Sequence, residues 1–339
     1  MAAKKSRTRK VTTGAVVAGL VAGAGYGGYQ LHRWSSGWDR AAEQGAAYTG
    51  PTSAAIAPAL LTWHEAGRIS TGLASVKSFV ILKDGSVVVA GERKLRVLSA
   101  TGAVLRDMPL VGMPQAVTAM ETADGVLLFA GLKDHVEVFD SNGSPKGKWP
   151  TLGDGAFVTC LTPGTAGKTI WVADAGRRVV SELDLSGKVL REVGRTDQAN
   201  HAPGLVVPSA HLDVVVDGTT VWVNNPGRHE LEAYDTQGVM IRQWGEAGDG
   251  IGQFTGCCNP TDFYRFSDGR VVTAEKGTPR VKVFDGSGVL QSVITTDFSP
   301  NAAGIDVAGD SMGRVWVLDP VLHDLRIYAP NPGGLAGNF

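Results

Sequence analysis

The chain of 339 residues carries a formal net charge of −1, with 43% hydrophobic and 19% charged side chains. Apolar residues recur along most of the length, which excludes general disorder, and 45 glycines argue against a bundle of long helices. Residues 1–10 hold five basic side chains and no acidic one, so the remainder is acidic overall and offers no basic face to a nucleic acid.

The amino-terminal region has the pattern of a membrane-targeting segment. After the basic residues 1–10, residues 11–31 contain no charge and consist mainly of Val, Ala, Gly and Leu. As a helix this run would span about 31 Å, the thickness of the hydrocarbon core of a bilayer. Because the positive charges precede it, we expect a cytoplasmic amino terminus and a periplasmic or extracellular location for the bulk of the chain. Two interpretations stay open: an uncleaved single-pass transmembrane anchor, or a signal segment cleaved after Ala22-Gly23-Ala24.

Residues 32–59 are rich in Ala, Gly, Ser and Thr, which predicts a flexible linker. From about residue 60 onward the chain repeats a unit of short apolar segments joined by glycine turns. The first turn of each unit contains Gly85, Gly125, Gly167, Gly218, Gly269 and Gly313. A period of roughly 40–50 residues built from short strands is typical of a β-propeller. We therefore predict an all-β, six-bladed propeller with four-stranded antiparallel blades over residues 60–330, followed by a tail at 331–339.

The ends of the repeat region predict how the ring closes. The last unit finishes near Pro330 and leaves no sequence for its outermost strand. The segment 61–67, Leu-Thr-Trp-His-Glu-Ala-Gly, parallels residues 242–248, Arg-Gln-Trp-Gly-Glu-Ala-Gly, which form the predicted outer strand of the fourth unit. We expect residues near 60–64 to supply the missing strand and to hide both edges of the array.

Two stretches resemble NHL repeats, a family of propeller blades. One runs from Gly250-Ile251-Gly252-Gln253-Phe254 through Pro260 to the segment 280–285, Arg-Val-Lys-Val-Phe-Asp. The other is the segment 171–178, Trp-Val-Ala-Asp-Ala-Gly-Arg-Arg. The resemblance covers roughly residues 60–330, although blades one and two have Gly91 and Gly131 where Asp174 stands in the third. It implies a propeller that binds proteins, peptides or RNA, and a few related propellers are lyases or hydrolases.

Strand alternation predicts which face carries a binding site. We label the strands of a blade A to D from the channel outward, so the B–C loops and the D-to-A connections share one face. The longest connections, residues 191–209 and 244–261, lie on that face. We expect a ligand there, at the channel mouth. The candidate binding residues on this face are Asp174, Asn225, Asn259, Glu275, Lys276, Asp319 and His201, together with the two cysteines discussed below.

The carboxylates that end the B strands allow two readings. They could ring a calcium ion or act as acid and base. Asp or Asn at such a position also accepts hydrogen bonds from its own loop backbone, which is an ordinary structural use.

The segment Cys257-Cys258-Asn259-Pro260 is the most unusual motif on this face. Two adjacent thiols can shape a rigid loop, close a vicinal disulfide or bind a soft metal ion such as copper. Cys257 and Cys258 are therefore candidate metal ligands as well as binding residues, and His211, in the predicted inner strand of the fourth blade, is a further candidate ligand. The spacing fits neither a zinc site nor covalent haem attachment.

These patterns predict a membrane-tethered propeller that acts as a non-catalytic platform for a protein or small-molecule ligand. No catalytic residue is assigned. The alternatives are a redox or metal-binding protein that uses Cys257 and Cys258 with a membrane electron-transfer partner, and a calcium-dependent hydrolase or lyase.

Overall fold

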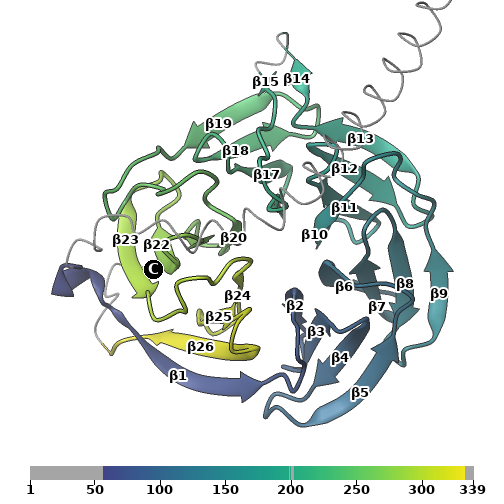
Figure 1. Cartoon of the computed structure of the whole chain (residues 1–339). Coiled ribbons are helices and arrows are strands. Elements are labelled where there is room, and N and C mark those ends of the chain that lie inside the picture. Colours follow the sequence, from purple (N-terminus) through teal and green to yellow (C-terminus); the bar gives the residue numbers. More distant parts are fainter. Residues whose placement is uncertain (1–55, 198, 200–201, 333–339) are drawn as a thin grey trace, which may run out of the picture. The chain divides into compact units, whose positions relative to one another are not determined.

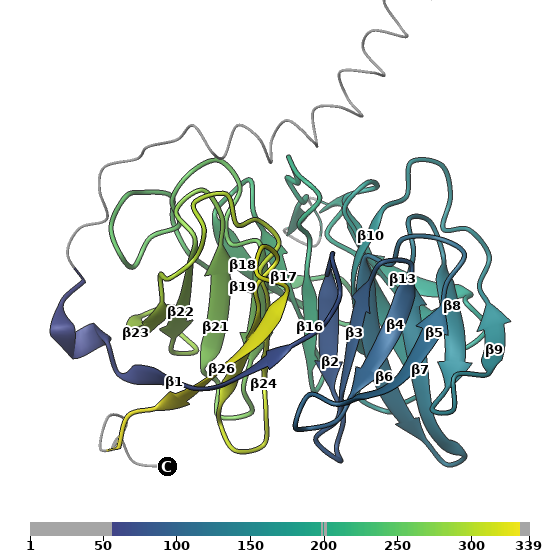
Figure 2. The ribbon, with the colours of Figure 1, turned by 60° about the horizontal axis from the view of Figure 1, so that its bottom comes forward.

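The computed structural model describes residues 56–197, 199 and 202–332. In these residues six four-stranded antiparallel sheets stand around a central channel like the blades of a propeller (Figure 1). The predicted blade number and blade type are therefore confirmed. In each blade the four strands are ordered from the channel outward, with strand A innermost and strand D on the outer rim (Figure 2).

The strands of the first three blades follow one another directly in the sequence. Blade 1 contains β2 (Ser78–Ile81), β3 (Val87–Gly91), β4 (Lys94–Leu98) and β5 (Val104–Pro109). Blade 2 contains β6 (Ala116–Thr122), β7 (Gly125–Gly131), β8 (Val136–Asp140) and β9 (Pro145–Lys148). Blade 3 contains β10 (Val158–Pro163), β11 (Thr169–Asp174), β12 (Val179–Asp184) and β13 (Val189–Val193).

A small hairpin, β14 (Thr196–Asp197) and β15 (Ala202–Pro203), leads from blade 3 to blade 4. Blade 4 contains β16 (Val214–Asp217), β17 (Thr220–Asn225), β18 (Glu230–Asp235) and β19 (Met240–Trp244). Blade 5 contains β20 (Asp262–Arg265), β21 (Val271–Glu275), β22 (Arg280–Phe284) and β23 (Leu290–Thr295). Blade 6 contains β24 (Asp306–Gly309), β25 (Val315–Leu318) and β26 (Asp324–Pro330), and its fourth strand is β1 (Trp63–Ser70).

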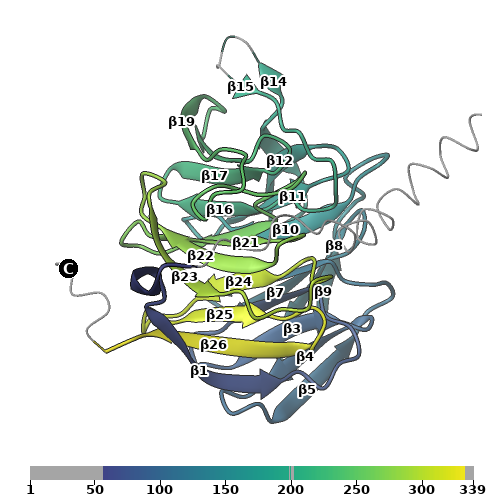
Figure 3. The ribbon, with the colours of Figure 1, turned by 60° about the vertical axis from the view of Figure 1, so that its left-hand side comes forward.

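Strand β1 closes the ring, because it pairs antiparallel with β26 at the other end of the chain (Figure 3). Trp63 is opposite Pro330, and Ser70 is opposite Asp324. The predicted closure is confirmed, and the closing strand continues past residue 64 to Ser70. A short 3-10 helix, η2 (Pro58–Leu60), precedes it.

The glycine turns fix the hairpins that the repeat predicts. Gly85 adopts a φ of +83° between β2 and β3, in the left-handed region where a glycine has no steric cost. Gly288 has a φ of +91°, and a Cβ there would lie 2.7 Å from the Trp244 ring of the neighbouring blade. These glycines let the turns form and let adjacent blades approach closely.

The hydrophobic core is divided among the seams between blades. Six clusters of buried side chains lie at the six blade–blade interfaces, because every blade packs one face against the blade before it and one against the blade after it. The B strands are buried on both faces, as in Val87–Gly91, and therefore read as continuous apolar runs. Burial of this kind contributes about 25 cal/mol for each Å² of apolar surface, so the seams hold the ring together.

Several sequence predictions lie outside the described residues. These are the basic segment 1–10, the anchor or signal segment 11–31, most of the linker 32–59, His201, and all but the start of the tail 331–339. Within the part of the chain that the structure describes, no helix is long and apolar enough to cross a membrane.

Candidate functional site at the channel mouth

The polar residues that end the B strands are buried and hold loops of their own blade. The Oδ1 atom of Asp174 accepts hydrogen bonds from the backbone N–H groups of Phe157, at 2.8 Å, and Arg177, at 3.0 Å. The Oδ1 atom of Asp319 likewise accepts from the backbone of Val321 and Leu322, at 2.9 and 3.0 Å. These carboxylates serve the loop backbone, which is the structural use anticipated for them.

Asn225, at the end of β17, is also fully buried. Its Oδ1 atom accepts a hydrogen bond from the backbone of Val206 at 2.9 Å, and its Nδ2 atom donates to the Glu232 carboxylate at 2.8 Å. The side chain therefore ties the connection that precedes blade 4 to strands B and C of the same blade.

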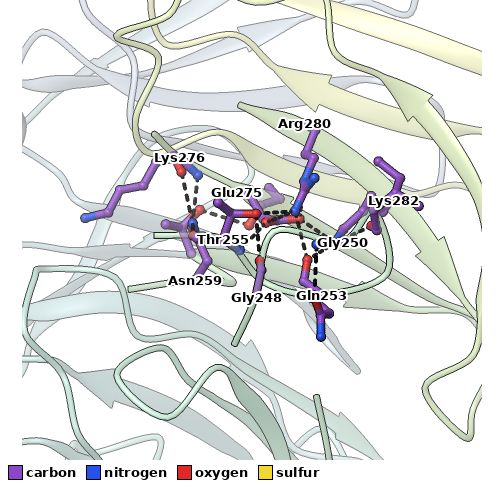
Figure 4. A network of polar contacts seen from close by, with 12 residues as sticks. Gly248, Gly250, Gln253, Thr255, Asn259, Glu275, Lys276, Arg280 and Lys282 are labelled. Atoms are coloured by element: carbon purple, nitrogen blue, oxygen red, sulfur yellow. Dashed lines mark hydrogen bonds and ion pairs between the residues drawn. The ribbon is translucent and has the colours of Figure 1, made fainter. Parts of the chain in front are cut away.

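Glu275 is the centre of a buried ion-pair network in blade 5 (Figure 4). Arg280 donates to both carboxylate oxygens at 2.9 Å, and the Lys282 ammonium lies 2.6 Å from Oε1. The backbone N–H of Thr255 donates to Oε2 at 3.2 Å. Burial lowers the pKa of Lys282 to about 8. Because these charges satisfy one another inside the blade, Glu275 is not free to contact a ligand.

The Cys257–Asn259 segment forms a clamped loop at the mouth. The Asn259 side chain accepts a hydrogen bond from the Lys276 backbone N–H at 2.9 Å and donates to the Lys276 carbonyl at 2.9 Å and to the Thr255 carbonyl. Asn259 is 1% exposed, so it positions the loop and does not face solvent. Cys257 is exposed and Cys258 is buried, with their sulfur atoms 2.8 Å apart.

Lys276 turns its side chain away from the Glu275 network (Figure 4). Its ammonium donates a hydrogen bond to the Ser209 hydroxyl at 2.9 Å, and it forms no ion pair with a described carboxylate. Lys77, which leads into blade 1, is exposed and likewise has no carboxylate partner among the described residues. Both lysine charges act on His211. Burial, and then the two lysines, hold the pKa of the His211 imidazole well below its usual range, so the ring is neutral at neutral pH.

His211 lies just before strand A of blade 4. The ring forms no hydrogen bond with any described residue, and a Cβ added to Gly304, on the way into blade 6, would lie 3.6 Å from its Cε1 atom. Gly304, on the way into blade 6, thus lies beside this imidazole, and the charges of Lys77 from blade 1 and Lys276 from blade 5 act on it. We call these four residues the mouth cluster.

Three aspartates line the channel at the beginning of the inner strands of blades 4, 5 and 6. Each accepts a hydrogen bond from the inner strand of the next blade. The bonds run from Phe263 N–H to Asp213 at 2.9 Å, from Val307 N–H to Asp262 at 3.0 Å, and from Phe79 N–H to Asp306 at 2.8 Å. The three carboxyls therefore join consecutive blades around the channel.

The channel also raises the pKa of all three carboxyls. Burial is the main cause, and it raises the pKa of Asp306 to about 7. The pKa of Asp262 lies well above its usual value because of burial and the carboxyls of Asp213 and Asp306. Asp213 is raised by burial. Because their pKa values are raised, these acids carry less negative charge near neutral pH than exposed aspartates do, and they offset less of the positive charge of Lys77 and Lys276.

The sequence analysis missed Asp213, Asp262, Asp306 and Lys77. The sequence did contain a signal for the three aspartates, because they occupy equivalent positions in their blades. Asp262 is opposite Ala274 and Asp306 is opposite Leu318, and these two partners directly precede Glu275 and Asp319. In blade 4 the backbone N–H of Asp213 donates to the side chain of Asn224, which directly precedes Asn225. Alignment of the six repeats on their inner strands would have shown the series.

The described residues contain no ready-made metal site, since no group of three or more His, Cys, Asp or Glu side chains among them could hold a metal ion. A soft metal ion held by Cys257 and Cys258, or by His211, stays a prediction.

Comparison with known proteins gives the fold. No protein-family model matches the chain, and no curated protein matches its sequence. Among solved structures, a streptogramin B lyase has a TM-score of 0.52 at 15% identity, with 76% of this chain and 79% of that chain covered. Virginiamycin B lyase from Staphylococcus aureus has a TM-score of 0.57 at 11% identity, with 79% and 99% covered. A catalytically inactive His-to-Ala variant of that lyase, solved with quinupristin, has a TM-score of 0.53 at 13% identity, with 75% and 80% covered.

These three distant structural neighbours are lyases. At 11–15% identity they share the architecture with this chain, and the chemistry has to be argued from its own residues.

Proposed function

We propose that this propeller is a binding protein that receives the anionic group of its ligand, a carboxylate or a phosphate, at the mouth cluster. The observation that carries the proposal is the pair of lysines, Lys77 and Lys276, whose charges both act on His211 and which have no described carboxylate partner. Two positive charges beside a channel whose acids have raised pKa values attract an anion, and charge-assisted hydrogen bonds would hold it.

The contrast with the other buried cations supports this proposal. Arg280 and Lys282 share the Glu275 carboxylate, and Arg326 lies within 3.0 Å of both Glu65 and Asp297. Those cations are part of the framework. The lysines of the mouth cluster are available to a ligand because nothing in the described residues neutralises them.

The resemblance to NHL repeats and the amino-terminal pattern extend the proposal. We infer an NHL-like platform that is tethered to a membrane through residues 11–31 and works outside the cytoplasm. Binding without catalysis fits a mouth where the acids that end the B strands are engaged in loop hydrogen bonds.

Anion binding is tested by calorimetric titration of the full chain with inorganic phosphate and with acetate. Each charge-assisted bond contributes about 1.5–3 kcal/mol, so we expect Lys276→Met and Lys77→Met each to weaken binding about tenfold or more. Lys168→Met is the matched control, because Lys168 lies at an A–B turn on the opposite face. Equal affinity in all four proteins would contradict the proposal.

His211 supports a second candidate function, that of a lyase. A neutral imidazole at a channel mouth can take a proton from a substrate, and the adjacent lysines would stabilise the negative charge that develops. One distant neighbour, virginiamycin B lyase, is described as inactive after a His-to-Ala change. Under this reading His211 is the base.

The two candidates are separated by incubating the protein with virginiamycin B and following the antibiotic by chromatography and mass spectrometry. Conversion that is lost in His211→Ala while phosphate binding persists would establish the lyase reading. No conversion by the wild-type protein, together with anion binding, leaves the binding function alone.

A further inference from the structure

The neighbouring thiols of Cys257 and Cys258 form a second chemical feature of the mouth, independent of anion binding. Their sulfur atoms lie 2.8 Å apart, beyond the roughly 2.05 Å of a disulfide bond. Cys257 is exposed, whereas Cys258 is only 1% exposed. The Cys257 thiol is therefore accessible to a reagent from solvent, whereas the Cys258 thiol is buried next to it.

The loop that carries the pair is fixed on both sides. After the pair, Asn259 is held by the three hydrogen bonds to Lys276 and Thr255 described above. Before the pair, the Gly256 carbonyl is 2.7 Å from the Nε2 atom of His229 on the B–C loop of blade 4. The two sulfurs are thus kept together by the framework, which lowers the entropic cost of joining them.

Charged and polar groups surround the inner thiol. Burial raises the pKa of Cys258, and the Lys276 charge and a hydrogen bond with Ser209 act in the opposite direction. Lys276 is itself bonded to Ser209 at 2.9 Å. The pKa of Cys258 still lies above its usual value, and Lys276 offsets part of the cost of forming the Cys258 thiolate, the form that attacks a disulfide.

We propose that Cys257 and Cys258 form a redox-active pair that cycles between two thiols and a vicinal disulfide by exchange with a low-molecular-weight disulfide. A trans peptide joins the two residues and fixes their Cα atoms about 3.8 Å apart. Ordinary disulfides span about 4.4–6.8 Å between Cα atoms, so a bridge between neighbours is strained and easily reduced. Ready reduction makes the pair suited to reversible use.

The exchange balances in two steps. The Cys257 thiolate attacks one sulfur of the reagent R–S–S–R, and the released R–S⁻ takes up the proton that Cys257 has lost. The Cys258 thiol then loses its proton and attacks Cys257 Sγ, which forms the vicinal bond and releases the second R–S⁻, protonated to RSH. Two thiols of the protein lose two electrons and two protons, and one reagent disulfide becomes two thiols.

The third cysteine provides an internal control. Cys160 lies in β10 on the inner strand of blade 3, and its thiol is 3.7 Å from the Val214 carbonyl. Burial and the neighbouring Asp213 hold its pKa well above the usual value. We expect Cys160 to remain a thiol under conditions that oxidise the pair.

The experiment treats the folded full chain with glutathione disulfide, alkylates remaining thiols and analyses the intact protein and the peptide containing both cysteines by mass spectrometry. The wild-type protein should lose two hydrogens, retain one alkylatable thiol and recover fully with glutathione. Cys160→Ser should give the same oxidation. Cys258→Ser should stop at a mixed disulfide between Cys257 and glutathione, because the second step has no attacking thiol.

Circular dichroism of each variant verifies that it folds. The proposal is overturned if both cysteines of the folded wild-type protein stay alkylatable at excess oxidant. It is also overturned if the wild-type chain accumulates the mixed disulfide to the same extent as Cys258→Ser, or forms only disulfides between chains. None of these readouts depends on ligand binding, so failure here leaves the proposed function standing.

Discussion

Blade 5 and blade 2 place chemically different side chains at equivalent positions of strands B and C. In blade 5, the end of strand B and the facing strand C carry Glu275, Arg280 and Lys282, and all three side chains are buried. The corresponding positions of blade 2 are occupied by Gly131, Val136 and Val138, which are apolar. The backbone pairing is the same in both blades, so the fold does not require the ions.

The difference shows what the charges are used for. Arg280 and Lys282 each donate to the carbonyl of Gln253, in the long connection that carries the Cys257–Asn259 loop to the mouth. Blade 2 has a short connection before its inner strand and no such loop to hold. Buried ion pairs cost desolvation and give little net stability, so we interpret the blade 5 network as a device that positions the loop.

The largest effect on the free energy of unfolding is expected when the blade 5 network loses the Glu275 carboxylate. Glu275→Ala leaves two buried cations without a counter-charge, and the free energy of unfolding should fall by about 3–5 kcal/mol. Denaturant unfolding at equilibrium measures the change.

A triple variant sharpens the comparison. Glu275→Gly combined with Arg280→Val and Lys282→Val gives blade 5 the residues of blade 2, and it should recover at least half of the loss because no charge is left buried and unpaired. A triple variant as unstable as Glu275→Ala would show that the ions are needed for the fold itself.

A smaller effect on the free energy of unfolding is expected from the channel aspartates, which only blades 4–6 carry: Asp213, Asp262 and Asp306. The pKa of Asp306 is raised to about 7 in the folded chain, so the folded state binds more protons than the unfolded state between about pH 4 and 7. Its contribution to stability is present at low pH and is lost as the pH rises through 7. Asp306→Asn should remove about 3 kcal/mol of this pH dependence between pH 4.5 and 7.5.

The measurement is the free energy of unfolding at pH 4.5 and 7.5 for the wild-type protein and the variant. Asp124 provides the control, since it is exposed and lies in the turn between β6 and β7, away from the three channel aspartates. Asp124→Asn should keep the wild-type slope. An unchanged slope in Asp306→Asn would place the titrating group elsewhere.

The smallest effect is expected at the surface of blades 1 and 2. Lys83 and Glu121 form an ion pair at 2.6 Å, with side chains 79% and 48% exposed. Solvent screens such a pair, so Lys83→Met should change the free energy of unfolding by less than about 0.5 kcal/mol. A loss comparable to that of Glu275→Ala would erase the distinction between surface and buried charges on which the comparison depends.

Sequence reasoning recovered the fold because its main determinant is local and periodic. Glycine turns such as Gly85 and apolar B strands such as Val87–Gly91 repeat in every blade, and the likeness of segment 61–67 to 242–248 indicated the closure. The site was recovered only in part. Cys257 and Cys258 stood out as an unusual pair, whereas Asp213 looked like any other acid, because its role depends on neighbours in other blades.

Strand pairing at the closure also bears on synthesis. Glu65 and Arg326 lie in paired strands yet are 261 positions apart. A ribosome therefore delivers β1 first and its partner last, and the nascent chain holds an unsatisfied edge until nearly all of it has emerged. A chain that stops before β26 would keep that edge exposed as a template for another molecule. Premature termination before β26 should therefore yield aggregates, even though five complete blades had been made.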